Sequence, residues 1–412
     1  MMKKSTILIL ILAGVLLGAC RQPALEYADF DTFQVLSVKS SELFDEDGLI
    51  NPEVQLMDED GAPATANAGT KTAKTNSVAL ARDLFGSFNS NKVVQIAGTF
   101  KGHDLDGSPL VQSGKLVLPA SGRIKNMVIV SHFTIGANSE APSEAFPIEG
   151  ILAGKGYAVL EADYIGFGVT ADRIHPYMHT LSTSQSVIDM ALAVKPYLEH
   201  IGRAPESPEV ILVGYSQGGS TTMAVMSRLQ REYKDVFPIK KTYAGGGPYD
   251  LCATFDISME WDETGIPCAI PMIVQGINEG ESLGLKMEDF FKPNLLAHYK
   301  EWINSKKYTV TEINALINSS YLHEIMTDKG RDKTNNQTAR LYKALLTNST
   351  LNFEPTSPVF MFHSRDDKTV PFVNAERAER YFKMHDVHYD FDHYGAHGTA
   401  YLQFIIKVSK DL

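Results

Sequence analysis

The feature that most constrains the fold is an alternation of short apolar runs with helical segments, which begins at Val93. The runs at 127–130 and 210–213 are apolar at every position, which is typical of strands buried on both faces of a parallel sheet. We predict strands at 93–99, 110–118, 126–131, 157–161, 210–213, 359–362 and 389–392, and helices at 184–199, 218–232, 373–384 and 399–410. This order favours an α/β fold whose mainly parallel sheet is covered by helices on both faces.

One segment, 252–353, interrupts the alternation. It is largely helical in pattern, lies between predicted strands and contains both tryptophans of the chain. We interpret it as a helical cap inserted into a catalytic domain that spans 91–412. Residues 20–90 precede this domain and include a stretch rich in Ala and Thr at 61–75, so we predict a tether and lead-in segment there.

The first nineteen residues have the pattern of an export signal. Lys3 and Lys4 precede an apolar stretch, and Leu-Gly-Ala-Cys at 17–20 supplies small residues at a cleavage point. The same four residues match the lipobox of bacterial lipoproteins, which implies cleavage before Cys20 and a lipid on its sulfur. The alternative is an ordinary signal peptide followed by an incidental cysteine. We predict a signal peptide at 1–19 and a protein of the cell envelope, lipid-anchored to a bacterial membrane.

The charge balance bears on the partners of the protein. The chain has 38 basic and 49 acidic residues, a net charge of −11, and it becomes more acidic when Lys3 and Lys4 leave with the signal. An acidic surface repels nucleic acid and anionic membrane faces. We therefore expect no nucleic-acid partner, and membrane attachment through the lipid on Cys20 rather than through a basic patch.

The remaining cysteines and two histidines raise the question of crosslinks and metals. Cys252 and Cys268 could close a disulfide in an oxidising envelope. Neither cysteine lies in a CxxC pattern, so we predict no zinc site. His175 and His179 have metal-ligand spacing, but Pro176 argues against a regular helix across them, and a structural or substrate-wall role is the better interpretation.

A candidate nucleophile follows the predicted strand 210–213. Residues 214–218 read Gly-Tyr-Ser-Gln-Gly, a G-x-S-x-G pattern, and a predicted helix begins directly after it. A sharp strand-to-helix turn needs glycines around the serine and presents the hydroxyl at the helix N-terminus. The alternative is a glycine-rich turn without catalytic role. The setting favours Ser216 as a nucleophile.

A serine nucleophile needs a base and an orienting carboxylate, and both follow in the order serine, acid, histidine. Asp367 lies in the loop after the predicted strand 359–362; Asp366 competes for the same role, and either could be a solvated turn acid. His397 lies in Gly-Ala-His-Gly at 395–398, where flanking glycines permit a tight loop. We predict a triad of Ser216, Asp367 and His397.

In combination these motifs resemble the α/β-hydrolase superfamily, and within it the secreted lipase-like esterases of bacteria and fungi. Those proteins pair a G-Y-S-x-G-G elbow with an H-G-x-x-D-x-x-V-P acid loop, which reads His-Ser-Arg-Asp-Asp-Lys-Thr-Val-Pro at 363–371 here. They also carry a D-Y-x-G-x-G segment, found at 163–168, and a nearby H-P-Y at 175–177. The resemblance runs from about Val93 to the C-terminus. It implies an eight-stranded, mainly parallel α/β-hydrolase sheet with an inserted helical cap.

One departure from the family concerns the oxyanion hole. The family has H-G-T or H-G-G after the third strand, whereas this chain has Phe133 where the glycine is expected. A backbone donor does not require glycine at that position. We assign the oxyanion donors to the N–H groups of Gln217 and Thr134, with the Thr134 hydroxyl as a third candidate.

The resulting expectation is a serine esterase that needs no cofactor and cleaves carboxylic esters through an acyl-enzyme. Phe133 beside the oxyanion loop is expected to narrow the acyl side and favour short chains. The larger apolar cap residues could wall a pocket or could form only the core of the cap itself: Trp261, Met272, Ile273, Val274, Phe290 and Phe291. The alternatives are a lipase for longer chains, a serine peptidase and, from another class, a non-catalytic ligand-binding lipoprotein.

Overall fold

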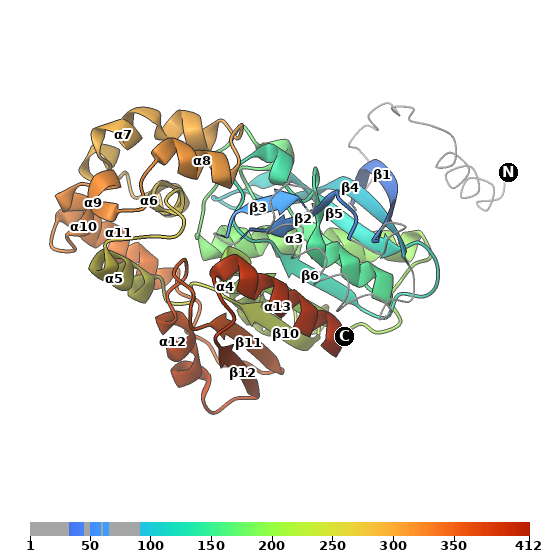
Figure 1. Ribbon diagram of the computed structural model, residues 1–412. Helices are drawn as coiled ribbons and strands as arrows, with labels where there is room; N and C mark the ends of the chain where they lie inside the picture. The colour runs from blue at the N-terminus through green and yellow to red at the C-terminus, as the bar shows by residue number, and fades with distance from the viewer. Residues whose placement is uncertain (1–32, 45–49, 59–60, 66–90) are drawn as a thin grey trace.

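The computed structural model describes residues 33–44, 50–58, 61–65 and 91–412. A nine-stranded sheet forms its centre, in the order β1-β4-β5-β8-β6-β9-β10-β11-β12 (Figure 1). Its strands are β1 (Gln34–Glu42), β4 (Lys92–His103), β5 (Pro109–Pro119), β6 (Met127–Ser131), β8 (Ala158–Ala162), β9 (Val210–Tyr215), β10 (Ile239–Gly245), β11 (Val359–Ser364) and β12 (Val387–Asp392). The prediction of a mainly parallel α/β sheet is confirmed, although this sheet has nine described strands rather than eight.

The parallel part of the sheet aligns the strand ends that matter for the site. Strands β8, β6, β9, β10, β11 and β12 are parallel, and β1, β4 and β5 are joined in antiparallel fashion at one edge. Ser131 at the end of β6 pairs with Gly214, and Tyr215 at the end of β9 pairs with Gly245 of β10. Loops that leave these carboxyl ends therefore meet at one place.

Both faces of the sheet are buried, which explains the uninterrupted apolar runs. Along β9, Ile211 and Val213 belong to the core beneath the last helix, α13 (His397–Asp411), and the short helix η2 (Ile148–Lys155). Val210 and Leu212 belong to the opposite core, formed with α3 (Thr180–His200), α4 (Gln217–Glu232) and α12 (Val373–Phe382). Successive side chains of a strand point to opposite faces, so β9, which is covered by a core on each face, is apolar from Val210 to Val213.

The segment predicted as tether and lead-in contributes strands to the fold. β1 pairs antiparallel with β4, and β2 (Val54–Met57) joins β3 (Pro63–Thr65) and β7 (Phe146–Pro147) in a second sheet. Most side chains of β1 are exposed, including Leu36 at 59%. Two strands of the large sheet, β1 and β10, are absent from the sequence predictions. β1 buries almost no side chain, so it lacks the apolar pattern that indicates a strand. Cys20 and the predicted signal lie outside the described residues.

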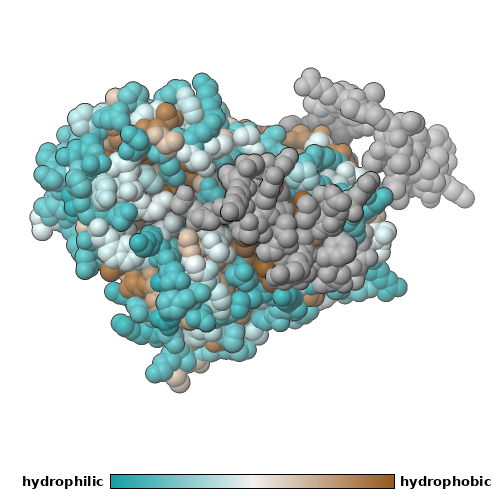
Figure 2. Space-filling model, viewed as in Figure 1, coloured by the Kyte–Doolittle hydropathy of each residue, from teal (hydrophilic) through white to brown (hydrophobic). Residues whose placement is uncertain are grey.

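Between β10 and β11 the chain forms a group of helices with its own hydrophobic core (Figure 1, olive to orange). They are α5 (Leu251–Trp261), α6 (Ala269–Gly280), η4 (Met287–Asp289), α7 (Pro293–Tyr299), the π-helical turn η5 (Lys300–Asn304), α8 (Val310–Ile317), α9 (Leu322–Ile325), α10 (Asp328–Arg331) and α11 (Asn336–Thr347). Two further short helices, η1 (Asn138–Glu140) and η3 (Gly168–Thr170), lie in loops of the sheet domain. The face of the helical group visible in Figure 2 is mainly hydrophilic. Within the described residues, no helix combines the length and apolarity needed to cross a bilayer.

Candidate active site

Ser216 occupies a strained turn between β9 and α4. Its backbone has φ 59° and ψ −127°, a region that L-residues rarely adopt and that costs on the order of 1–3 kcal/mol. A Cβ on Gly218 would lie 1.9 Å from the carbonyl oxygen of Ser131, and one on Gly214 would lie 2.3 Å from the carbonyl oxygen of Gly218. The absence of a side chain at Gly218 therefore lets α4 approach the end of β6, and its absence at Gly214 lets α4 approach β9. The Ser216 N–H donates to the carbonyl of Gly245, 2.9 Å away, which fixes the turn to β10.

His397 and Asp367 are brought together 30 residues apart in the chain. The Nδ1 atom of His397 lies 2.5 Å from Oδ2 of Asp367, and both side chains are buried. The other carboxylate oxygen, Oδ1, accepts hydrogen bonds from the N–H groups of Thr369 and Val370 at 2.9 and 2.8 Å. Because its two oxygens have separate partners, the carboxylate is held in one orientation toward the imidazole.

Burial disfavours the charged form of Asp367, yet the carboxylate stays ionised. The facing charge of His397 and the hydrogen bond to it, together with His363 and the Val370 N–H, outweigh the burial and hold the pKa of Asp367 below its usual range. His363 lies 3.5 Å from Asp367 and contacts the carbonyl of Val370 through Nε2. A carboxylate that is ionised in a buried place can stabilise an imidazolium beside it.

The second ring nitrogen of His397, Nε2, is buried and makes no hydrogen bond to any described residue. A buried ring nitrogen without a hydrogen-bond partner lowers the stability of a protein. A general base, however, needs a ring nitrogen that is free to accept a proton and return it.

Ser216 is linked to His397 through its neighbour Tyr215. The Tyr215 hydroxyl donates to the carbonyl of His397 over 2.9 Å, and the two rings pack with centroids 5.0 Å apart. Ser216 itself is 7% exposed. The elbow and the histidine loop are thus joined by a direct contact next to the predicted nucleophile.

The competing acid, Asp366, is directed away from this group. Its Oδ1 lies 2.7 Å from Nδ1 of His393, and both side chains are largely exposed. Ser364 stands where the family has glycine, and its hydroxyl donates to the carbonyl of Gly395 over 2.7 Å. The acid loop is therefore joined to the histidine loop beside Asp366, while Asp367 alone faces His397.

The two predicted oxyanion donors lie on the segments that meet at the elbow. Gln217 is the first residue of α4, where the N–H groups have no intrahelical acceptor. Thr134 lies in the loop after β6 and is buried. The exit of this loop is shaped by Glu140, whose Oε2 accepts from the N–H groups of Gly136 and Ala137 at 2.8 and 2.9 Å.

Two expectations about side chains near the site are wrong. Phe133 does not face the acyl side: it is buried in the core, and its ring packs edge-on against Tyr401 of α13 with centroids 5.4 Å apart. Cys252 and Cys268 form no disulfide, since both are free, buried thiols. Cys252 donates to the carbonyl of Tyr342 instead, and burial raises the pKa of its thiol to about 11.

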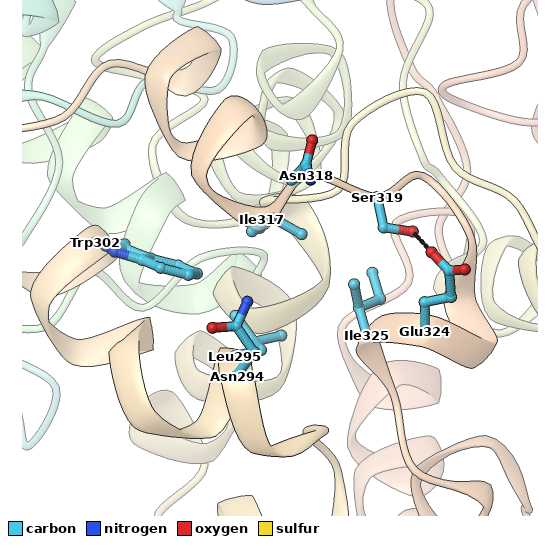
Figure 3. A pocket seen from close by; sticks show the side chains of 8 residues that line it. All are labelled: Asn294, Leu295, Trp302, Ile317, Asn318, Ser319, Glu324 and Ile325. Carbon is cyan, nitrogen blue, oxygen red and sulfur yellow. Dashed lines mark hydrogen bonds between the residues drawn. The ribbon is translucent and has the colours of Figure 1, made fainter.

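Most of the apolar cap residues singled out in the sequence belong to the core of the helical group, and Trp261 does not. Phe290 and Phe291 are fully buried, Met272 and Val274 are nearly so, and Trp261 is 46% exposed. A hollow within the group lies between α7, η5, α8 and α9 (Figure 3). It is lined by Asn294, Leu295, Trp302, Ile317, Asn318, Ser319, Glu324 and Ile325. This hollow contains none of the predicted triad residues.

Sequence reasoning missed a close contact between Gly61 and His397. A Cβ on Gly61 would lie 2.9 Å from Cδ2 of the imidazole. Gly61 has φ +90° and lies in a turn in which Asp58 accepts from the N–H groups of Gly61 and Ala62 at 3.1 and 2.8 Å. Residues 58–61 read Asp-Glu-Asp-Gly, a sequence typical of a surface turn, and nothing in it indicates a partner more than three hundred residues away.

The histidines with metal-ligand spacing are engaged by protein groups. His175 Nδ1 lies 2.7 Å from the carbonyl of Ile165, and His179 Nδ1 lies 2.9 Å from the Ser182 hydroxyl. Among the described residues, no three His, Cys, Asp or Glu side chains gather as a metal site would require.

Comparison with known proteins identifies the class. The structure is similar to the rice cell wall degrading esterase LipA from Xanthomonas oryzae, with a TM-score of 0.71 and 22% identity over 81% of this chain and 94% of that one. It is also similar to lipase A of Candida antarctica, with a TM-score of 0.56 and 16% identity over 74% and 73% of the two chains. The fold is therefore that of the α/β-hydrolases. No curated protein matches the sequence.

The family follows from the sequence match. Residues 139–402 match the secretory lipase family, and these residues make up more than half of the chain. The chain belongs to this family, and it is a carboxylic ester hydrolase.

Proposed function

We propose that Ser216, His397 and Asp367 form a catalytic triad that hydrolyses carboxylic esters of short acyl chains. The observation that carries this proposal is the state of His397. Its Nδ1 is held by an ionised, buried carboxylate, and its Nε2 has no partner among the described residues. A histidine so placed can accept a proton only at Nε2, on the side that a serine hydroxyl would approach.

The reaction proceeds in two transfers. The Ser216 oxygen attacks the ester carbonyl carbon while His397 Nε2 takes the hydroxyl proton, and Asp367 stabilises the imidazolium. The tetrahedral intermediate collapses when His397 returns the proton to the leaving alkoxide, and an acyl-serine remains. Water then attacks the acyl carbon with His397 again as base, and the acid and free serine are released.

The developing oxyanion would be bound by the N–H groups of Gln217 and Thr134. Both belong to segments that Gly218 brings into contact, because its missing side chain lets α4 approach the carbonyl of Ser131. Amides fixed before the reaction begins stabilise the transition state without reorganising, and each is worth about 3 kcal/mol.

The preference for short acyl chains rests on the helical group at 252–353, which we propose acts as a cap. Its segments pack directly on the loops of the site: a Cβ on Gly136 would lie 2.8 Å from the carbonyl of Tyr308 and 2.9 Å from a side-chain carbon of Ile313. The face of the cap that Figure 2 shows is mainly hydrophilic, so that face offers no large apolar surface to a lipid. A closed cap favours small esters over long chains.

We further propose that the protein is anchored in a bacterial cell envelope through a lipid on Cys20. Membership of a secretory family supports export. The Leu-Gly-Ala-Cys pattern at 17–20 supports the lipid attachment, and the acidic charge balance favours a lipid over a basic patch as the means of attachment.

The test is hydrolysis of a p-nitrophenyl ester series from acetyl to palmitoyl by the wild type, Ser216→Ala and the control Ser121→Ala, whose serine is exposed in the turn after β5. We expect the highest kcat/KM at acetyl to butyryl, loss of activity in Ser216→Ala, and wild-type activity in Ser121→Ala. A fluorophosphonate probe is expected to label all but Ser216→Ala. Activity retained within tenfold in Ser216→Ala would reject the triad, a maximum at palmitoyl would indicate a lipase, and preferential amide cleavage would indicate a peptidase.

A further inference from the structure

The segment between β8 and α3 reaches both predicted oxyanion donors. It contains the His-Pro-Tyr sequence at 175–177, which the sequence singles out and the triad does not use. The Tyr177 hydroxyl lies 2.7 Å from the Thr134 hydroxyl, and both side chains are buried. A short hydrogen bond between two buried hydroxyls restricts the rotamer of Thr134.

His175, in the same segment, contacts the second predicted oxyanion donor, Gln217. Its Nδ1 lies 2.7 Å from the carbonyl of Ile165, an acceptor, so this nitrogen carries the proton. Its Nε2 is then an acceptor, and it lies 3.2 Å from the side-chain amide nitrogen of Gln217. Burial lowers the pKa of His175 well below its usual value, which keeps the ring neutral and the acceptor available.

The position of this segment is itself fixed by the cap. A Cβ on Gly276 of α6 would lie 2.2 Å from the backbone nitrogen of Tyr177, and one on Gly280 would lie 2.3 Å from the ring of His179. The two glycines are one helical turn apart, so one face of α6 rests directly on the segment. Gly166, in the loop after β8, also packs closely on this segment: a Cβ on Gly166 would lie 2.5 Å from the backbone of His175.

We infer that His175 and Tyr177 are positioning residues of the oxyanion hole: Tyr177 sets the loop of Thr134, and His175 sets the first residue of α4. The inference rests on the proposed function. Neither residue contacts a reacting atom, so each acts by holding a donor where the oxyanion forms. A donor that is displaced loses transition-state stabilisation while ground-state binding changes little.

The principal test is Tyr177→Phe, which removes one hydroxyl, with Tyr157→Phe as the matched control. The Tyr157 hydroxyl is likewise bonded, at 2.8 Å to the carbonyl of Leu412, so the control loses a similar hydrogen bond far from the elbow in sequence. We expect Tyr177→Phe to lower kcat about tenfold with KM within twofold, and to slow inactivation by a fluorophosphonate by a similar factor. Tyr157→Phe is expected to change neither, with a comparable shift in Tm.

A double-mutant cycle separates positioning from general destabilisation. Thr134→Val removes the hydroxyl to which Tyr177 is bonded, and Thr134→Ser keeps it. If Tyr177 acts through Thr134, its substitution has almost no further effect on kcat in the Thr134→Val background and its full effect in the Thr134→Ser background. Equal effects of Tyr177→Phe in both backgrounds would overturn the assignment.

His175 is tested through its partner. Gln217→Met keeps the backbone N–H of the donor and removes the amide that His175 accepts from, and we expect about a fivefold loss in kcat with KM unchanged. Wild-type kcat in both Gln217→Met and Tyr177→Phe, with Ser216 still labelled by the probe, would reject the positioning role and leave the triad standing. Failure of the probe to label the wild type would instead reject the proposed function.

Discussion

The hydroxyl of Tyr215 donates a hydrogen bond to the backbone carbonyl of His397 over 2.9 Å, between residues 182 positions apart. Tyr215 immediately precedes the predicted nucleophile, and its ring also packs against Tyr401 and Phe404 of α13. Tyr215 therefore connects the turn that carries Ser216 directly to the helix that begins at His397. A fixed relation between nucleophile and base is what an effective attack geometry requires.

Tyr215→Phe is expected to weaken this connection without removing the ring packing. The hydrogen bond between the Tyr215 hydroxyl and the His397 carbonyl is lost, so we expect the free energy of unfolding to fall by about 1 kcal/mol and kcat to fall about fivefold. Urea denaturation and steady-state kinetics measure the two effects. An unchanged kcat together with lowered stability would show that the bond serves stability alone.

Asp367→Asn and Asp366→Asn separate the two neighbouring acids. Asp367 faces His397 at 2.5 Å, so its amide variant favours the wrong tautomer and is expected to lower kcat by about 10³- to 10⁴-fold. Asp366 pairs with exposed His393, and its variant is expected to retain activity within threefold. The comparison uses kcat for p-nitrophenyl acetate. The reverse order of effects would transfer the role to Asp366.

Glu140 is expected to make stability depend on pH. Burial raises the pKa of this carboxyl to about 7 in the folded protein, against 4.5 for a free glutamate. Between these values the folded state binds the proton more tightly than the unfolded state, so the stability from this group is present below about pH 4.5 and is lost as the pH rises through 7.

Glu140→Gln removes that dependence. We compare the unfolding free energy of the variant with that of the wild type at each pH. We expect this difference to change in favour of the variant by roughly 2 kcal/mol as the pH rises from 5 to 8. Urea denaturation of both proteins at the two pH values measures the difference, and the single-site comparison cancels the contribution of other titrating groups. A constant difference across this range would contradict the raised pKa.

Gly61→Ala tests whether the N-terminal turn bears on catalysis. The added methyl would lie 2.9 Å from the His397 ring, so we expect kcat to fall more than about tenfold. Gly107→Ala is the matched control, because Gly107 has a similar φ of +82° but no atom within 4 Å of the position of its Cβ. Both variants should lose about 1 kcal/mol of stability from the strained backbone. Equal kcat values in the two variants would show that the added methyl group can be accommodated without affecting the function of the His397 imidazole.

Cys20→Ser is expected to release the protein from membranes. The lipid predicted on this sulfur is the attachment that the sequence provides, so the variant should appear in the soluble fraction after cell fractionation and lack the mass of a diacylglycerol. Wild-type activity of the released protein would show that the anchor serves location and not the reaction. Sedimentation of the variant with membranes would indicate attachment through another protein.

Local patterns in the sequence predicted most of the sheet and named the residues that we propose as the triad. The runs at 127–130 and 210–213 are apolar at every position, and an elbow such as Gly-Tyr-Ser-Gln-Gly needs its glycines, so both features can be recognised from a few consecutive residues. The order of Ser216, Asp367 and His397 along the chain can likewise be read from the sequence. β1 escaped this reasoning because it pairs with β4 through its backbone and leaves most side chains exposed.

Tertiary structure decided what depends on the direction of a side chain or on a distant partner. Asp366 and Asp367 are adjacent and chemically alike, and only the fold of their loop directs one to His393 and the other to His397. Phe133 turned toward Tyr401 because the core beneath the loop offered an aromatic contact that no local pattern reveals. The contacts of Gly61 with His397 and of Tyr177 with Thr134 likewise join segments that meet only when the sheet is assembled. Short-range propensity is encoded in neighbouring residues, whereas these contacts arise from packing between segments remote in the chain.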